Sequence, residues 1–281
     1  MKLFPHYGTP PIISIEGAPD SQLAPSVRQR RRFEKLLASL DNDQWAASTR
    51  CEGWDVADVV AHLISVNVFW KVSIERGLAG NPTRYLEDFD PAVTPSQLVA
   101  NVRGTSPRDL FDQLVASNND LLDLVESLDD SGWAQSAECP VGHLPVRLIL
   151  QHGLWDGWIH ERDVALPLGL PVTVEPDEVI SSLVYVSALS PAIALIRGDS
   201  LRGEFTLTTD SPPSNWRIDV AKQVEVRQSE AAFATPSLQG AAEDLAEALS
   251  LWSPLPSGTP EVWRRLLAGG LSVAFHADSR L

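Results

Sequence analysis

The sequence predicts a four-helix bundle followed by a small α+β domain. Before about residue 170 the apolar residues recur with helical spacing, whereas after about residue 200 they form short alternating runs separated by turns. A chain of 281 residues is comfortably long for two domains. We therefore predict an irregular N-terminal arm over residues 1–22, a helical bundle over 23–170 and a C-terminal domain over 176–281.

Four long amphipathic helices are expected in the first part. The first covers about residues 24–40 and is marked by its apolar stripe. The second begins after Asp55, which is a good N-cap residue, and the third begins at Ser106, where a proline follows at the first helical position. The fourth begins near Pro145 and ends before Pro167. The long connection between the second and third helices suits a four-helix bundle.

The second part begins after a linker at residues 171–176. A helix is expected from about Asp177, with a break near Pro191. Later segments are assigned from their periodicity and their turn residues. They are strands over 203–209, 216–221 and 224–228 with a hairpin connection at 212–215, helices over 238–252 and 261–268, and a last strand over 271–275.

Composition excludes several classes of partner. The formal net charge is −15 and the sequence pI is about 4.7, so the surface repels nucleic acid and anionic lipid. The one basic cluster, residues 28–32, is expected to be the solvated face of a helix. No apolar run approaches the roughly 20 residues that span a bilayer, and no export signal begins the chain. We expect a soluble cytoplasmic protein with free thiols at Cys51 and Cys139.

Histidine and aspartate side chains fall on apolar helix faces. His62 lies between Val59 and Val66 on the stripe of the second helix, where an imidazole needs a polar partner. On the fourth helix, residues 152, 156 and 160 are His, Asp and His, and a spacing of four stacks them on one face. Such a pair of Asp and His can bind a metal ion, and a third ligand from a facing helix would leave one position open, as in catalytic zinc sites. An Asp–His hydrogen bond without metal is the alternative.

Other polar residues are weaker candidates. Cys139 and His143 share a predicted loop but lack further metal ligands nearby. A packing role is expected for Cys51, although its position at the start of a helix would allow a reactive thiol. Core packing is also expected for Trp155 and Trp158. Three charges near the end of the fourth helix are expected to be solvated, with support of a site as the alternative: Glu161, Arg162 and Asp163.

Two segments of this sequence resemble the signatures of a known family. Trp45 and the run Thr-Arg-Cys-Glu-Gly-Trp-Asp-Val-Ala-Asp-Val-Val-Ala-His-Leu at 49–63 make the first, and Trp-Asp-Gly-Trp-Ile-His-Glu-Arg-Asp at 155–163, followed by Pro-Leu-Gly at 167–169, makes the second. They resemble the mycothiol-dependent maleylpyruvate isomerase family of the DinB-like metalloenzyme superfamily. The resemblance covers about residues 25–170, and the later layout is similar to the sterol-carrier-like second domain of that family.

The resemblance implies a metal site and its ligands. His62, Asp156 and His160 would bind a divalent metal, which we expect to be zinc, and His152 is a further candidate ligand. Asp156 departs from the glutamate that is more usual in the family. No catalytic residue beyond these ligands is assigned, and no arginine of the second domain can be placed in a site.

The resemblance also implies a thiol cosubstrate. A metal can hold mycothiol or a related small thiol as a thiolate, poised to attack an electrophilic small molecule. We expect S-transfer or conjugation, with thiol-dependent cis–trans isomerisation as the alternative. From another class, the chain could be a non-enzymatic binding protein for lipids or small molecules, with a structural metal. A monomer or a homodimer is expected.

Overall fold

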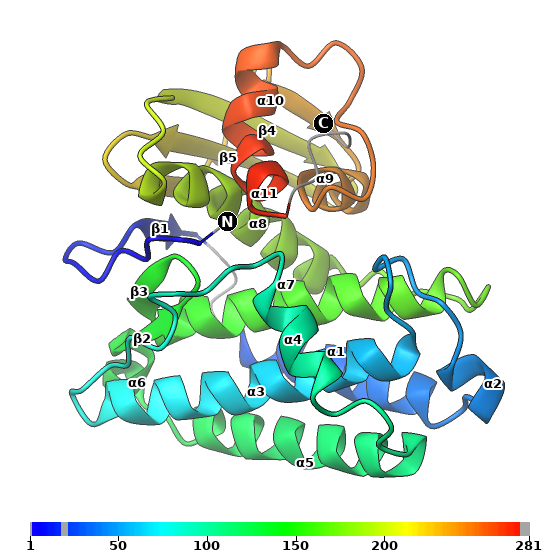
Figure 1. Cartoon of the computed structure of the whole chain (residues 1–281). Helices are drawn as coiled ribbons and strands as arrows, with labels where there is room; N and C mark the ends of the chain where they lie inside the picture. The colour runs from blue at the N-terminus through cyan, green and yellow to red at the C-terminus, as the bar shows by residue number, and fades with distance from the viewer. Residues whose placement is uncertain (1, 18–21, 276–281) are drawn as a thin grey trace.

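The computed structural model describes residues 2–17 and 22–275, and it places a helical bundle beneath a layer that contains a sheet (Figure 1). The predicted order, a bundle followed by an α+β domain, is confirmed. The bundle is built mainly from four long helices: α1 (Leu23–Leu37), α3 (Val56–Leu78), α5 (Pro107–Glu126) and α7 (Val146–Ala165). Both predicted N-caps are confirmed, because Asp55 accepts from the amide of Asp58 and Ser106 accepts from the amide of Asp109.

Shorter elements connect these helices. The long connection after α3 contains α4 (Thr94–Ala100), and α2 (Asn42–Trp45) and α6 (Asp130–Ala134) are single turns or little more. An antiparallel hairpin of β2 (Ser136–Cys139) and β3 (Gly142–Pro145) precedes α7. His143 therefore lies in a strand and not in the predicted loop.

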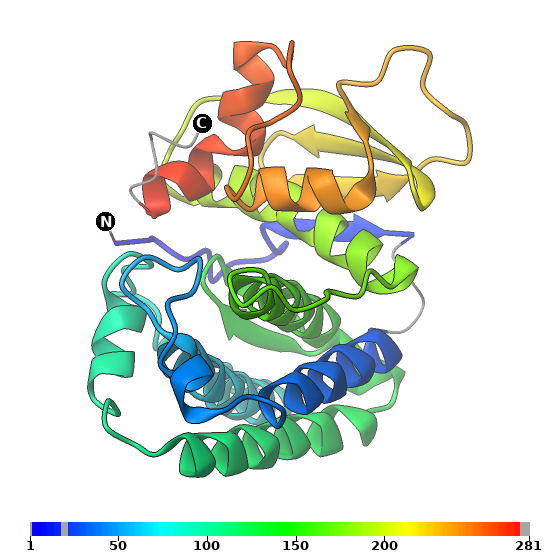
Figure 2. The same ribbon diagram turned by 90° about the vertical axis from the view of Figure 1, so that its right-hand side faces the viewer.

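Helix α8 (Pro176–Ile196) lies between the bundle and the sheet (Figure 2). It contacts α7, α9 and α11, and it continues through Pro191, where the sequence predicted a break. Packing on several sides holds the helical conformation past the proline. By length and composition α8 and α3 could each cross a membrane, contrary to the sequence expectation, but most of the apolar window of α8 is buried inside the protein. Here α8 is the central helix of the core.

A five-stranded sheet forms the upper layer in the described residues, with the order β1-β6-β5-β4-β7. Strands β4 (Gly203–Asp210), β5 (Pro213–Val220) and β6 (Val224–Gln228) are the three predicted strands, with the β4–β5 turn at residues 211–212. The predicted helix over 238–252 is divided into β7 (Leu238–Gly240) and α9 (Ala242–Leu249).

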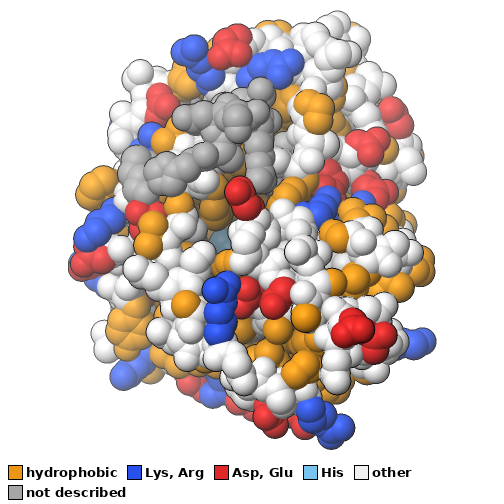
Figure 3. Space-filling model, turned by 45° about the vertical axis from the view of Figure 1, so that its right-hand side comes forward, with side chains coloured by type: hydrophobic (Ala, Val, Ile, Leu, Met, Phe, Trp, Pro, Cys, Tyr) orange, Lys and Arg blue, Asp and Glu red, His pale blue; other side chains and the backbone are white. Residues whose placement is uncertain are grey.

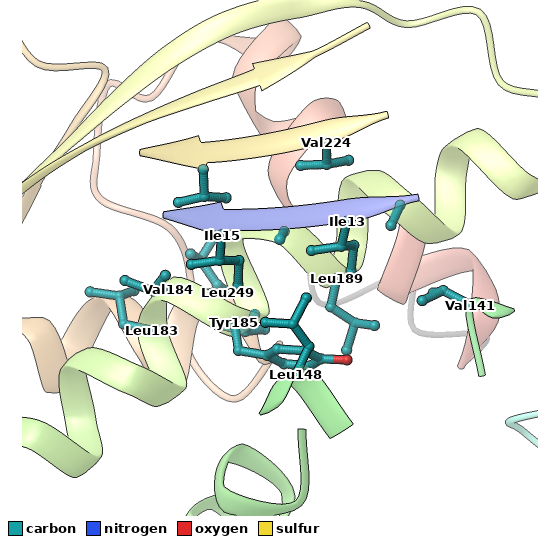
Figure 4. Packing of buried hydrophobic residues seen from close by; sticks show 14 of the residues in the cluster. Ile13, Ile15, Val141, Leu148, Leu183, Val184, Tyr185, Leu189, Val224 and Leu249 are labelled. Carbon is teal, nitrogen blue, oxygen red and sulfur yellow. The ribbon is translucent and has the colours of Figure 1, made fainter. Parts of the chain in front are cut away.

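The fifth strand comes from the start of the chain. Residues predicted as an irregular arm contain β1 (Ile13–Glu16), which pairs in parallel with β6. Ile13 and Ile15 point toward α8 in the core, close to Val184 and Leu189 (Figure 4). The sequence pattern does not predict this strand, because its alternation lasts only four residues.

The chain ends in two short helices, α10 (Glu261–Leu267) and α11 (Gly269–Ala274). The prediction of a last strand over residues 271–275 is wrong. Leu271 and Ala274 are both buried and three residues apart, so they share one helix face, whereas a strand would place them on opposite faces. A short apolar run does not distinguish the two structures.

One hydrophobic core runs through both layers and joins α7, α8 and the inner face of the sheet. A second cluster fills the end of the bundle near α2, around Phe33, Trp45 and Leu114. On the surface face shown in Figure 3, lysine and arginine side chains are scattered and form no stripe. Cys51 and Cys139 are both unpaired, as predicted.

Candidate metal centre

Three predicted ligands meet between α3 and α7. His62 Nε2 lies 3.7 Å from Asp156 Oδ2, and His160 Nε2 lies 3.6 Å from Asp156 Oδ1. One nitrogen or oxygen atom from each of the three residues lies within 4.8 Å of the other two. The side chains retain only 13–14% exposure, so each is shielded by the bundle yet still reached by solvent. The i, i+4 spacing on α7 and the facing position on α3 produce this arrangement.

The charges of these residues are strongly coupled. Burial alone would raise the pKa of Asp156, but the positive charge of His160, and then of His62, lowers it below its usual range. Burial opposes protonation of His160, but the charge of Asp156 and the hydrogen bond to Asp163 outweigh it and raise its pKa well above its ordinary value. A carboxylate close to two imidazoles therefore attracts positive charge to this point.

The site contains buried polar atoms without a hydrogen-bond partner, and a cation would satisfy the carboxylate oxygen among them. His62 Nδ1 and Asp156 Oδ2 are buried and have no hydrogen-bond partner within the described residues. A buried polar atom without a partner is costly, so an unsatisfied carboxylate oxygen calls for a further ligand. Two imidazoles and one carboxylate form a donor set that zinc accepts, with a fourth position left for another molecule.

Asp163 contacts the ring nitrogen of His160 that does not face Asp156. Its Oδ2 atom lies 2.9 Å from His160 Nδ1, so Nε2 of the same ring is left to face Asp156. Carboxylates that bind the distal nitrogen of a ligand histidine fix its tautomer and its orientation. Asp163 is fully buried, so the prediction of a solvated helix-end charge is wrong for this residue.

Cys51 belongs to the same group of side chains. Its Sγ donates to Asp163 Oδ2 at 3.2 Å and lies 3.8 Å from His160 Nδ1. Burial raises the pKa of the thiol, which disfavours the reactive thiolate that a helix N-terminus could have produced. Cys51, His160 and Asp163 also bring one ligand atom each within 4.8 Å of one another. Arg50 donates to Asp163 at 2.9 Å, however, and its charge opposes a cation on that side of the ring.

His152, the further candidate ligand, has a different partner. Its Nδ1 atom lies 2.8 Å from the hydroxyl of Tyr185 on α8, and its ring is packed between Trp70, Trp155 and Tyr185. It is in neither of the groups of close ligand atoms. Burial lowers the pKa of His152 to about 4, so the ring is neutral at physiological pH. The structure places it one turn before Asp156 on α7, as a packing residue.

The remaining candidates lie elsewhere. Cys139 is buried in β2, and His143 Nε2 lies 2.8 Å from the carbonyl oxygen of Thr83. Neither belongs to a group of close ligand atoms in the part of the chain that the structure describes. Trp158 is buried, as expected of a core residue. Trp155 is partly buried and donates to Ser250 Oγ at 2.9 Å, which ties α7 to the segment after α9.

Charges expected on the surface form internal ion pairs. Arg32 binds Glu161 at 2.7 Å and Glu178 at 2.7 Å, which joins α1 to α7 and α8. Burial lowers the pKa of Arg30 to about 10, and its side chain is enclosed by the bundle. Arg162 binds glutamates of α9 and stacks on the ring of Trp158 at 4.6 Å. The prediction of a solvated face is therefore wrong for Arg30 and Arg32, although Arg31 is exposed as predicted. The prediction of solvated charges is wrong for Glu161 and Arg162.

An open cavity of about 580 Å³ adjoins the centre, lined by the start of α3 and the end of α4. Cys51 and Trp54 form its wall toward the histidines, and the ring of Trp54 lies 5.3 Å from that of His62. Arg103 also lines the cavity and pairs with Asp58 at 2.8 Å. The cavity has the size of sites that hold small molecules.

Comparison with known proteins tests the predicted family and the fold. The sequence profile described as "Mycothiol maleylpyruvate isomerase N-terminal domain" matches residues 27–165. This part of the chain belongs to that family. The matched region contains all three ligand candidates and ends at the last residue of α7, so the resemblance predicted from the sequence is confirmed for the helical bundle.

Solved structures extend the likeness to the second layer. A mycothiol-dependent maleylpyruvate isomerase and a histidine-to-alanine variant of it superpose on this chain with TM-scores of 0.59 and 0.60. Each is 14% identical, and the alignment covers 83% of this chain and 88% of the other. At that identity the likeness establishes a shared fold. No curated protein sequence matches the chain.

Arg50 was missed from the sequence, whereas support of a site by Asp163 was the alternative to a solvated charge. Asp163 follows His160 by three positions, and this spacing already places it on the same helix face. Arg50 gives no such signal, because its contact to Asp163 joins segments 113 residues apart.

Proposed function

We propose that this protein is a metal-dependent enzyme that activates a low-molecular-weight thiol for attack on an electrophilic small molecule. His62, Asp156 and His160 would hold one divalent ion, which we expect to be zinc. The observation that carries the proposal is the convergence of their three ligand atoms within 4.8 Å, with an unpartnered buried oxygen on Asp156. The family of the bundle supports the same function, because its name refers to mycothiol.

The arrangement favours an open position over a structural site. Structural zinc normally has four protein ligands, whereas catalytic zinc has three and one exchangeable position. The two nearest candidates for a fourth ligand have other partners, since His152 contacts Tyr185 and Cys51 donates to Asp163. When bound, the ion would supply the positive charge that keeps a thiol ionised at neutral pH. Mycothiol is the thiol we propose to test first.

The residues of this chain would hold and shield that chemistry. Asp163 would keep the proton of His160 on Nδ1, so that Nε2 stays available. The neighbouring cavity, which Trp54 and Arg103 line, would admit the electrophile. The cytoplasm is the compartment we propose, since Cys51 and Cys139 are unpaired and thiols stay reduced there.

Two outcomes of thiol attack need to be distinguished. If the thiol stays on the substrate, the enzyme is an S-transferase, which is the reaction we propose. If the thiol adds, a double bond rotates and the thiol leaves, the enzyme is a cis–trans isomerase, and the fold shared with a maleylpyruvate isomerase favours testing this reaction beside the first. Mass spectrometry of the products separates them, because only the S-transferase consumes thiol in proportion to product.

The first experiment is metal analysis of the purified protein by mass spectrometry. We expect about one zinc per chain in the wild type and at most a small fraction of this in His160→Ala. Cys139→Ala is a matched control, because Cys139 is buried away from the site and should leave the metal content unchanged. A folded wild type that takes up no zinc after reconstitution would overturn the proposal and favour a non-enzymatic binding protein.

A further inference from the structure

We propose that Glu247 of α9 acts through Arg50 to position Asp163 and the imidazole of His160, so that the second domain helps to hold the metal site. The metal measurements below rest on the proposed function, whereas the measurement on the metal-free protein does not. Glu247 and Arg50 are positioning residues in this proposal, since neither touches the three candidate ligands in the described contacts.

A continuous line of contacts joins α9 to His160. Glu247 accepts from Arg50 through both carboxylate oxygens, with Oε2 to Nη1 at 2.8 Å and Oε1 to Nη2 at 3.2 Å. The Nε atom of Arg50 donates to Asp163 Oδ1 at 2.9 Å. The other oxygen of Asp163, Oδ2, lies 2.9 Å from His160 Nδ1. These contacts use both oxygens of each carboxylate and three nitrogens of Arg50.

Arg50 is held in place from several directions. Its guanidinium lies over the ring of Trp252 at 4.6 Å, and its backbone amide donates to the carbonyl oxygen of Asp163 at 3.1 Å. The planar guanidinium forms paired hydrogen bonds with a carboxylate on one edge and keeps Nε free for another acceptor. A lysine at this position could not contact both carboxylates in the same geometry.

The buried charges of Asp163, Arg50 and Glu247 stabilise one another. Asp163 is fully buried, and the side chains of Arg50 and Glu247 are 20% and 10% exposed. Without Arg50, the carboxylate of Asp163 would lose its only arginine partner among the described contacts and would keep only His160 as a cationic partner, which is unfavourable for a buried carboxylate. Glu247 in turn keeps Arg50 extended toward Asp163, because it binds the far edge of the guanidinium.

The neighbouring glutamate of α9 provides a matched control. Glu243 binds Arg162, as Glu247 also does, but no contact joins Glu243 to Arg50 or Asp163. Glu243→Gln therefore removes a charge from the same helix and from the same domain contact without touching the line of contacts to His160. Glu247→Gln removes the charge and keeps the shape of the side chain.

The metal measurements compare the three proteins after reconstitution with zinc or cobalt. We expect Glu247→Gln to weaken zinc binding about threefold to tenfold in a chelator competition, less than the ten- to hundredfold typical when a direct partner of a ligand is lost. The visible absorption of the cobalt form should shift in this variant, and Glu243→Gln should match the wild type in both measurements. Equal zinc affinity and equal spectra in all three proteins would overturn the proposal.

Nitrogen-15 spectra of the histidine rings in the metal-free protein provide an independent measurement. We expect the Nδ1 and Nε2 shifts of His160 to change in Glu247→Gln and to stay at the wild-type values in Glu243→Gln. If the wild type binds no zinc, the proposed function fails, but these shifts still decide whether Glu247 positions His160. Unchanged His160 shifts in a folded Glu247→Gln protein would contradict the inference.

A second variant covers the case in which Glu247→Gln does not fold. Arg50→Lys keeps the charge but loses the paired geometry, and we expect the same direction of change in zinc affinity and in the His160 shifts. Wild-type values for both quantities in folded Arg50→Lys would overturn the role of Arg50.

Discussion

The Nδ1 atom of His152 on α7 lies 2.8 Å from the hydroxyl oxygen of Tyr185 on α8, across the boundary between the bundle and the second layer. Both side chains are buried, and their rings meet edge to face with centroids 5.2 Å apart. Tyr185 thus gives a partner to an imidazole that would otherwise be an unsatisfied polar group in the core.

This relationship predicts that the contribution of His152 to stability decreases in mild acid. Burial lowers the pKa of His152 to about 4, whereas an unfolded histidine has a pKa near 6.5. Between these values the unfolded state binds more protons at this residue, so the contribution of His152 to the free energy of unfolding is fully retained above about pH 6.5 and decreases toward pH 4. At pH 5 the loss from this residue is about 2 kcal/mol. Urea denaturation of the wild type and of His152→Asn at pH 7.5 and pH 5 measures it, and the variant should lose less on acidification.

We expect a large decrease in the free energy of unfolding when Glu138 loses its charge. Its fully buried carboxylate accepts from Tyr7, Thr83 and the backbone amides of residues 85 and 86. Glu138→Gln would turn an amide NH₂ toward these donors and should lower the free energy of unfolding by about 2–4 kcal/mol. Glu87→Gln is the control in the loop that donates to Glu138, because the side chain of Glu87 is exposed and this substitution should change stability by less than about 0.5 kcal/mol. Equal stability of the two variants would contradict the structural role of Glu138.

Two adjacent glycines of α11 should respond in opposite ways. A Cβ at Gly270 would lie 1.9 Å from the carbonyl oxygen of Ser190, which is backbone of α8 and cannot move aside. A Cβ at Gly269 would meet nothing closer than 3.9 Å. We expect Gly270→Ala to destabilise the protein by at least about 2 kcal/mol and Gly269→Ala to be neutral or stabilising by up to about 1 kcal/mol. Thermal and chemical denaturation of both variants test the contact between α8 and α11.

The sequence predicted the elements that carry long, regular patterns. Helices α3 and α5 begin at Asp55 and Ser106 as expected, because a side chain that caps a helix acts within three residues. The segments β1 and α11 were assigned wrongly, since four to six residues carry too little periodicity and their structure is decided by contacts with β6 and α8. Long-range pairing of this kind leaves no local pattern.

In the candidate site too, local spacing was predictable from the sequence and long-range contacts were not. His62, Asp156 and His160 were found from helical spacing and from the family resemblance, and the structure brings them together. Arg50 and Glu247 could not be found in this way, because their contact joins positions 197 residues apart. Asp163 and Arg162 were predicted to be solvated because they lie near the end of a helix, and the local sequence does not show the ion pairs that bury them.

The parallel pairing of β1 with β6 has a consequence for the order of assembly during synthesis. Ile13 leaves the ribosome about 200 residues before its partner Val224, a delay of roughly 10–40 s at ordinary rates of translation. The helices of the bundle can assemble during that interval, while the apolar side chains of Ile13 and Ile15 still lack β6. The N-terminal strand therefore joins the sheet late in biosynthesis, and until then a chaperone or a strand of another chain could bind it.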